Sequence, residues 1–281
     1  MKNLRRRFLL SSALLLAVVA HADNWAPNLT LGTTWDSNLT NADVSTDRIG
    51  ALGFSADVVG HNRYALRGNN TLLPGFHFAA TGWPRFESLT SVAGGLRGEW
   101  QHKFGLGALA PVFSLELAGD LVGAREAGRS GTSYGATLAL RKRLNDAARL
   151  ALTQEFSRLD ARYAVYDRQS AQTTLEFGYD FTDVARITLG AFWRTGDVLS
   201  YATPPRPELI ALAPNRLPVE TFRRPMVAYS IDAHTVGAKF AVIRAVTDVA
   251  AVVLSYEYRD TTHDPLRYTN HLVSLSVVRQ F

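Results

Sequence analysis

The chain contains no cysteine, so disulfide bonds and thiolate metal sites are excluded. It also lacks an apolar run long enough for a membrane-spanning helix, which needs about 20 residues. Metal-ligand spacing, a phosphate-binding glycine loop and a nucleotide-binding fingerprint are all missing. We therefore expect no cofactor and no metal, and stability must come from backbone hydrogen bonding and burial.

The one strongly apolar stretch near the N-terminus, residues 8–19, is typical of a secretory signal. Four basic residues precede it, and a small-x-small cleavage site, Ala20-His21-Ala22, follows it. We expect residues 1–22 to be removed on export and residues 23–281 to form the mature domain. A membrane anchor is the alternative reading, but the apolar run is too short for a span.

Net charge is also small once the signal is removed. The full chain has 30 basic and 25 acidic residues, a formal charge of +5. The signal carries four of the basic residues, which leaves 26 − 25 = +1 for the mature chain. This balance gives no indication of a nucleic-acid partner.

From residue 27 onward, hydrophobicity alternates with a period of two. In residues 173–181 (TTLEFGYDF), leucine and aromatic residues occupy one face and Thr, Glu, Gly and Asp the other. The segments are about ten residues long, with aromatic residues near their ends, which is the pattern of a transmembrane β-barrel. Such a barrel must be closed, because an open edge in hydrocarbon leaves backbone groups unpaired. A soluble periplasmic β-sandwich is the alternative, since its strands also alternate.

The alternation predicts an all-β, antiparallel, up-and-down barrel of twelve strands, with ten as the alternative. Short and long connections alternate, as periplasmic turns and extracellular loops do. The predicted strands are 28–37, 47–58, 71–83, 91–104, 109–121, 132–144, 148–159, 170–181, 184–196, 228–243, 249–260 and 270–281. The longer predicted connections are 38–46, 84–90, 122–131, 160–169, 197–227 and 261–269.

The last strand ends on an aromatic residue after alternating apolar positions, at Val273, Leu275, Val277 and Phe281. It resembles the signal read by the outer-membrane barrel-assembly machinery. Together with TTWDSNLT (33–40) and YEYRDTTHDP (256–265), it makes the chain similar to an uncharacterised family of proteobacterial outer-membrane β-barrels. This resemblance implies location in the cell outer membrane, with outer-membrane lipid, lipopolysaccharide and the assembly machinery as partners. It implies no particular activity.

Charged residues in the polar phase of the strands are the first candidate site. They are Arg97, Glu99, Lys103, Glu116, Asp120, Arg141, Arg143, Arg149, Glu155, Glu176, Asp180, Arg186, Arg194, Lys239, Glu257 and Arg259. A selective pore is expected to carry a ring of one sign. The near balance of signs instead predicts cross-strand ion pairs lining a narrow or plugged lumen, with a selective channel as the alternative.

Two further features lie in the predicted loops. The connection 197–227 is rich in proline yet keeps the apolar run 209–212, which predicts an inward-folded constriction or a binding lid, or otherwise a mobile surface loop. Acidic residues and histidines gather near the predicted outer rim, and these are Asp36, Asp197, Asp232, His234, Asp260, His263 and Asp264. Rim Asp/His pairs activate water in some outer-membrane hydrolases, but the motifs of those enzymes are absent here.

The sequence therefore favours a non-enzymatic outer-membrane barrel, either a narrow diffusion channel or a surface-interaction barrel. An outer-membrane protease or phospholipase with an Asp/His site at the rim is the alternative. No catalytic residue is assigned, and the sequence leaves the oligomeric state open.

Overall fold

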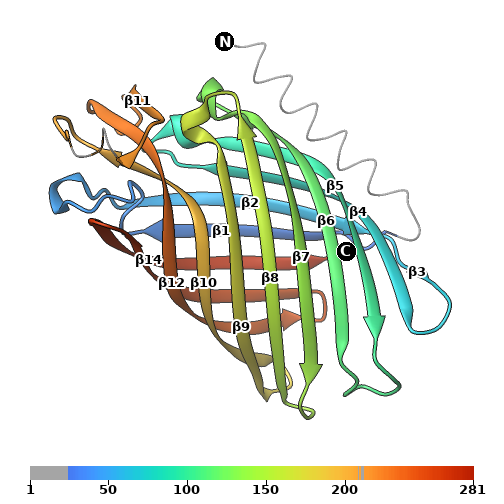
Figure 1. Cartoon of the computed structure of the whole chain (residues 1–281). Helices are drawn as coiled ribbons and strands as arrows, with labels where there is room; N and C mark the ends of the chain where they lie inside the picture. The colour runs from blue at the N-terminus through green and yellow to red at the C-terminus, as the bar shows by residue number, and fades with distance from the viewer. Residues whose placement is uncertain (1–24, 208, 210–211) are drawn as a thin grey trace.

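The computed structural model describes residues 25–281 except 208, 210 and 211, so the predicted signal segment lies outside the described residues. Twelve strands pair antiparallel in sequence order, and the last pairs with the first to close a barrel (Figure 1). They are β1 (Asn28–Asp36), β2 (Ala51–His61), β4 (Asn70–Gly82), β5 (Ser91–Lys103), β6 (Val112–Ala124), β7 (Gly131–Arg143), β8 (Ala148–Ala161), β9 (Arg168–Thr182), β10 (Ala185–Ala202), β12 (Met226–Thr247), β13 (Ala250–His263) and β14 (Leu266–Gln280). The prediction of a closed twelve-stranded barrel is confirmed, against ten strands or a sandwich.

Closure follows from the pairing of β14 with β1, which runs without interruption from Asn28↔Gln280 to Asp36↔Leu272. The backbone N–H of Phe281 donates to the carbonyl oxygen of Pro27 at 3.0 Å, so pairing extends to the end of the chain. The pairing of β14 with β1 therefore leaves no open sheet edge.

The two faces of the wall differ in chemistry. On β10 and β12, Phe192 and Thr235 are buried, whereas their neighbours Trp193 and Val236 are 53% and 59% exposed. Because successive side chains point to opposite faces, the exposed set marks the outside of the barrel. The outward phase is rich in large apolar side chains, among them Leu31, Leu52, Leu96, Leu117, Leu152, Leu175, Leu189, Leu254 and Leu275.

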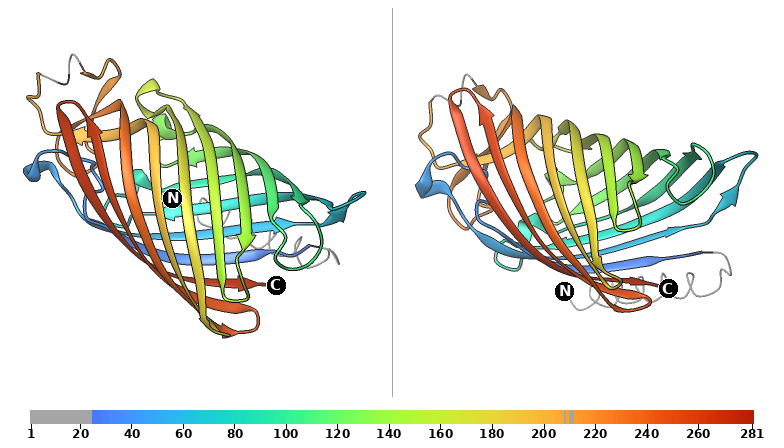
Figure 2. Two further views of the ribbon diagram at one scale, coloured as in Figure 1. Left: turned by 60° about the horizontal axis from the view of Figure 1, so that its bottom comes forward. Right: turned by 90° about the horizontal axis from the view of Figure 1, so that it is seen from below.

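The two ends of the barrel also differ (Figure 2). At the short-turn end, the connections are 62–69, 104–111, 144–147, 183–184 and 248–249, the first of which includes the short strand β3 (Tyr64–Ala65). At the long-loop end, they are 37–50, 83–90, 125–130, 162–167, 203–225 and 264–265. Four of these long-end loops contain a 3₁₀ turn: η1 (Ser45–Asp47), η2 (Glu87–Leu89), η3 (Ala127–Arg129) and η4 (Ala164–Tyr166). The loop 203–225 contains the short strand β11 (Arg216–Val219), which pairs with β12.

Four of the long-end loops are shorter than the sequence predicts, whereas the β1–β2 loop is longer, at 37–50 rather than 38–46. The β10–β12 and β13–β14 loops are shortened most. The β10–β12 ladder continues to Ala202↔Val227, so the loop predicted at 197–227 is confined to residues 203–225. Strands β13 and β14 pair as far as His263↔Leu266, which leaves only Asp264 and Pro265 of the loop predicted at 261–269. The extra strand residues include Val198 and Tyr201 in the first place and Thr261, Thr262 and Tyr268 in the second. These residue types favour strands, but they lie beside polar and proline residues that suggested a loop.

None of the described residues belongs to a helix that is long and apolar enough to span a membrane.

Candidate functional site

An apolar cluster lies at the long-loop end of the barrel. Phe222 of the β10–β12 loop contacts Phe86 and Tyr201, with ring centroids 4.9 and 4.8 Å apart. The other buried members are Ala51, Val165, Tyr166, Met226 and Ala228. These residues come from the β4–β5, β8–β9 and β10–β12 loops and from the ends of β2, β10 and β12. Because those strands lie on different sides of the wall, the cluster must lie over the mouth, and we call it the cap.

The cap shields its residues from water strongly enough to shift the pKa of one of them. Tyr166, in the β8–β9 loop, is buried, and burial raises the pKa of its hydroxyl to about 12. The Arg129 guanidinium lies 4.8 Å from the centroid of the Tyr166 ring and donates to the Tyr201 hydroxyl. A cation between two rings is a favourable cation–π arrangement when it is shielded from water.

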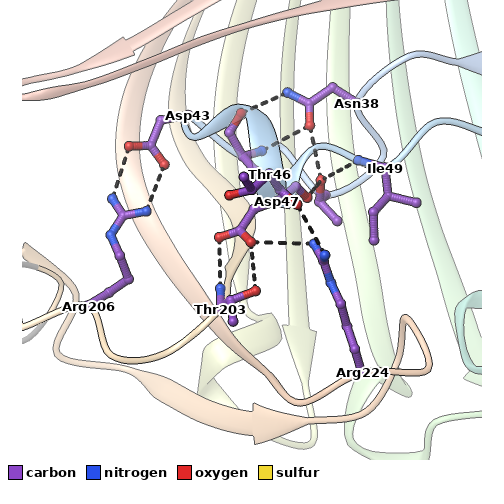
Figure 3. A network of polar contacts seen from close by, with 10 residues as sticks. Asn38, Asp43, Thr46, Asp47, Ile49, Thr203, Arg206 and Arg224 are labelled. Carbon is purple, nitrogen blue, oxygen red and sulfur yellow. Dashed lines mark hydrogen bonds and ion pairs between the residues drawn. The ribbon is translucent and has the colours of Figure 1, made fainter.

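A buried carboxylate joins the β1–β2 loop to the β10–β12 loop of the cap (Figure 3). Asp47, in the β1–β2 loop, accepts hydrogen bonds from the Thr203 backbone N–H at 2.8 Å and from the Thr203 hydroxyl at 2.6 Å. Arg224 Nη2 lies 3.4 Å from the same carboxylate. Nearby, the Asp43 carboxylate receives both terminal nitrogens of Arg206, at 3.3 and 3.0 Å. Charged hydrogen bonds of this kind fix geometry as well as adding stability.

The β1–β2 loop is itself held in shape by its own polar side chains. The Asn38 side-chain oxygen accepts from the Ala42 N–H and the Thr40 hydroxyl, and that hydroxyl also lies 2.8 Å from the Asp47 carbonyl oxygen. The Asn270 amide of β14 donates to the Asn38 carbonyl oxygen at 2.8 Å. This loop is therefore anchored on the barrel wall at one end and on the β10–β12 loop at the other.

The β10–β12 hairpin reaches the β1–β2 loop because β10 leaves its neighbour early. Its pairing with β9 ends at Gly196, where φ is +124° and a Cβ atom would lie 2.1 Å from the Gln169 carbonyl oxygen. Beyond this glycine, the free edge of β10 forms a hydrogen bond with the β1–β2 loop. The Tyr201 N–H donates to the Thr40 carbonyl oxygen at 2.9 Å. Glycine is required here by both its conformation and the close backbone approach.

The described residues of the apolar run in the β10–β12 loop are packed, not solvated. Leu209 and Ala213 are buried, and Leu212 packs with them, against a second apolar cluster that includes Tyr229, Ile231 and Ala233 of β12. Their packing supports the constriction or lid interpretation over a mobile surface loop.

Several of the charged residues predicted to line the lumen are brought together in pairs. Arg97 lies 4.0 Å from Glu116, and Arg141 lies 3.5 Å from Glu99. Lys239 lies 3.2 Å from Glu257, which also pairs with Arg259. Asp180 pairs with both Arg149 and Arg186. All of these pairs except Glu257–Arg259, which lies within β13, are cross-strand contacts of the kind that the balanced composition predicted.

Other members of the predicted set are not paired. Within the described residues, Glu155 and Glu176 make no ion pair. Arg143 donates to the Asp146 carbonyl oxygen at 3.0 Å, and Arg194 donates to the Asp197 carbonyl oxygen at 3.4 Å. Lys103 likewise has no carboxylate within ion-pair distance among the residues that the structure describes.

The sequence did not predict one contact, a histidine that bridges two carboxylates. His77 Nε2 lies 2.8 Å from Asp57 and its Nδ1 lies 3.0 Å from Asp120. His77 pairs with Gly95, which pairs with Asp120. Because Gly95 has no side chain, the imidazole reaches across β5, and a Cβ there would lie 2.6 Å from the Asp120 carboxylate. The only sequence signal is a glycine whose neighbours on both flanking strands are polar.

The rim residues do not assemble a catalytic pair. Asp36 accepts from Asn38 N–H and Asn270, and Asp260 binds Arg267. His234 stacks on Trp193, and His263 Nδ1 contacts the backbone oxygen of Asp232 at 2.5 Å. Asp197 accepts from the Gln169 N–H, and Asp264 lies in the β13–β14 turn. Among the described residues, neither rim histidine contacts a carboxylate, and no group of three or more His, Asp or Glu could hold a metal ion.

The residues of the predicted assembly signal lie on the outer face of β14. Val273, Leu275, Val277 and Phe281 are 42%, 48%, 47% and 60% exposed. Arg279 shares this face, and its guanidinium lies 4.7 Å from the centroid of the Phe281 ring. The arginine is therefore placed beside the terminal aromatic at the short-turn end, where a long basic side chain can reach lipid headgroups.

Replacing Arg279 with tyrosine is expected to leave barrel assembly unchanged or slightly improved, because an aromatic residue suits a membrane interface. The measurement is the fraction of protein that migrates as a folded, heat-modifiable species in unboiled gels. Phe281→Ala is the control and should assemble less well. Markedly poorer assembly of Arg279→Tyr would contradict the outward facing of this position.

No protein-family model matches the chain, and no curated protein matches it. Similar solved structures include the KdgM porin in complex with disordered oligogalacturonate (10% identity, 90% of this chain, 99% of that chain, TM-score 0.48). The NanC porin (7% identity, 90% and 100%, TM-score 0.48) and the Pseudomonas putida toluene transporter TodX (8% identity, 94% and 90%, TM-score 0.42) are also similar. These similarities are too distant to transfer a function, and the architecture rests on the strand pairings above.

Proposed function

We propose that the mature chain is a non-enzymatic outer-membrane β-barrel protein that acts as a narrow diffusion channel for small hydrophilic solutes. The observation that carries this proposal is the closed wall, apolar on its outer face and polar and charged on its inner face. Such a wall suits a barrel with lipid outside and water inside.

The outer face supports a membrane environment. In water, the many exposed leucines of the outward phase would form an apolar surface far larger than soluble monomers tolerate. Trp35, Tyr179, Phe181, Trp193 and Phe281 are also exposed. Aromatic residues of this kind form interfacial girdles on barrels. The secretory signal pattern and the C-terminal strand support the outer membrane as the destination.

The orientation follows from the two unlike ends. Barrels of this class carry short turns on the periplasmic side and longer loops outside. Strand β1 begins and strand β14 ends at the short-turn end, so both termini lie in the periplasm. The cap, with its loops from several sides of the wall, then covers the outer mouth and restricts access from outside the cell.

The interior supports a narrow passage. The inner face carries positive and negative side chains, several of them in ion pairs. In interior width, twelve-stranded barrels are intermediate between side-chain-filled eight-stranded barrels and open sixteen-stranded porins. The rim contacts support no nucleophile or base, so we propose no hydrolase. A surface-interaction role for the cap is the second candidate, favoured by the ordered packing of its loops.

The experiment is reconstitution of the folded mature protein into planar lipid bilayers. A narrow channel gives discrete, small conductance steps, and liposomes carrying the protein admit small sugars but not larger ones. Bilayers that stay silent with protein shown to be folded by heat-modifiable migration would overturn the channel and leave the surface-interaction role.

A further inference from the structure

A cavity of about 100 Å³ lies among the inward side chains of β9, β10, β12, β13 and β14. Asn41, from the β1–β2 loop, also lines it. The cationic lining residues are Arg194, Lys239 and Arg259, and the acidic one is Glu257. The remaining lining residues are neutral, and most of them are polar.

Strand register explains why these residues meet. Arg194 pairs with Thr235, Phe192 with Gly237, and Gly190 with Lys239, so three successive inward rows cross β10 and β12. The Phe192 ring lies over Gly237, because a Cβ on that glycine would be 2.1 Å from the ring. Arg259, opposite Gly237 on β13, and Lys239 then lie on the same inner face as Arg194.

The charges of the lining are not balanced. Glu257 is shared between Lys239, at 3.2 Å, and Arg259. The Arg194 guanidinium donates to the Asp197 carbonyl oxygen at 3.4 Å, and its buried Nε has no hydrogen-bond partner among the described residues. With three positive groups and one negative group, the lining has a formal charge of 3 − 1 = +2.

No carboxylate among the described residues lies within ion-pair distance of the Arg194 guanidinium. Glu155 is in the same row as Arg194 but two strands away, beyond Gln172. The Asp197 carboxylate accepts from the Gln169 N–H, and the Asp36 carboxylate accepts from Asn38 and Asn270. A partly buried guanidinium without a counter-ion is costly, so a negative ligand here would be favourable.

We infer that this cavity is a binding site for a small oxyanion, of which the phosphate dianion fits best, since two negative charges neutralise the lining. The planar guanidinium of Arg194 matches two oxygens of such an anion, and Thr235, Thr261 and Asn270 provide polar groups around it. This inference rests on the proposed channel function and adds small anions to the hydrophilic solutes that pass.

The test is calorimetric titration of the folded, detergent-solubilised mature protein with inorganic phosphate at mildly alkaline pH, where phosphate is mainly a dianion. Saturable binding is expected. Arg194→Gln should weaken it about tenfold or more, because it removes charged hydrogen bonds. Arg158→Gln is the matched control, since Arg158 lies on the outer phase of β8 and pairs with Asp160, and its affinity should equal that of the unmodified protein.

Each variant is first checked for folding by heat-modifiable migration, and Lys239→Gln replaces Arg194→Gln if the latter does not fold. Absence of phosphate binding, or equal affinity in the lumen variants and the control, would overturn the site. In bilayers, phosphate should reduce the chloride current saturably. If the barrel conducts but does not bind phosphate, the channel proposal holds and the phosphate site is overturned. If the barrel binds phosphate but does not conduct, the site holds and the channel proposal is overturned.

Discussion

Replacing Asp47 with alanine is expected to destabilise the packing of the β1–β2 loop against the β10–β12 loop by about 3 kcal/mol. The carboxylate is only 4% exposed and accepts two hydrogen bonds from Thr203 while lying beside Arg224. Its removal leaves the two Thr203 donors without their acceptor and leaves the partly exposed Arg224 guanidinium with only the Thr46 carbonyl oxygen. Amide hydrogen exchange in residues 37–50 and 203–225 should accelerate about 100-fold, which corresponds to that free energy.

The strands far from the cap should exchange at unchanged rates, because the barrel ladder does not depend on Asp47. Asp248→Ala is the control, since Asp248 lies exposed in a short turn at the opposite end. If Asp47→Ala and Asp248→Ala showed the same loop protection, the Asp47 contacts would not be what holds the two loops together.

Replacing Leu117 with arginine is expected to lower the free energy of unfolding in lipid vesicles by about 2–4 kcal/mol, the cost of an arginine near the bilayer midplane on a barrel's lipid face. Leu117 lies near the centre of β6 and is 58% exposed on the outward phase. The measurement is denaturant unfolding of the vesicle-inserted protein, followed by tryptophan fluorescence.

Leu106→Arg supplies the comparison for this substitution. Leu106 is 91% exposed in the β5–β6 turn, outside the strands, so the same change should cost little there. Equal destabilisation by the two variants would contradict the assignment of the outer face to lipid.

The strands were predictable because their signal is local. In residues 173–181, alternation alone predicts which face is apolar, and the large apolar residues Leu175, Phe177, Tyr179 and Phe181 are indeed all exposed. Alternation needs no knowledge of the partner strand, because the pleat forces every second side chain to one side. The balance of charges in the polar phase similarly predicted ion pairs, although not which residues form them.

The cap and its contacts could not be predicted in the same way. Asp47 and Thr203 are 156 positions apart, and neither loop shows a repeating pattern that indicates the other. Their meeting depends on β10 leaving β9 at Gly196, a single glycine among many in the strands. The His77 bridge likewise depends on register across four strands, and the cationic cavity depends on three successive inward rows. Such features come from tertiary geometry, which one-dimensional periodicity does not encode.

Excision of the β10–β12 loop tests most directly whether the cap restricts an otherwise polar passage. The β10–β12 ladder runs to Ala202↔Val227, so residues 204–224 can be replaced by a short Gly-Ser turn without breaking a barrel strand. Bilayers with the excised protein should show single-channel conductance several-fold above that of the unmodified protein. Equal conductance of the two folded proteins would contradict the claim that the cap controls the passage.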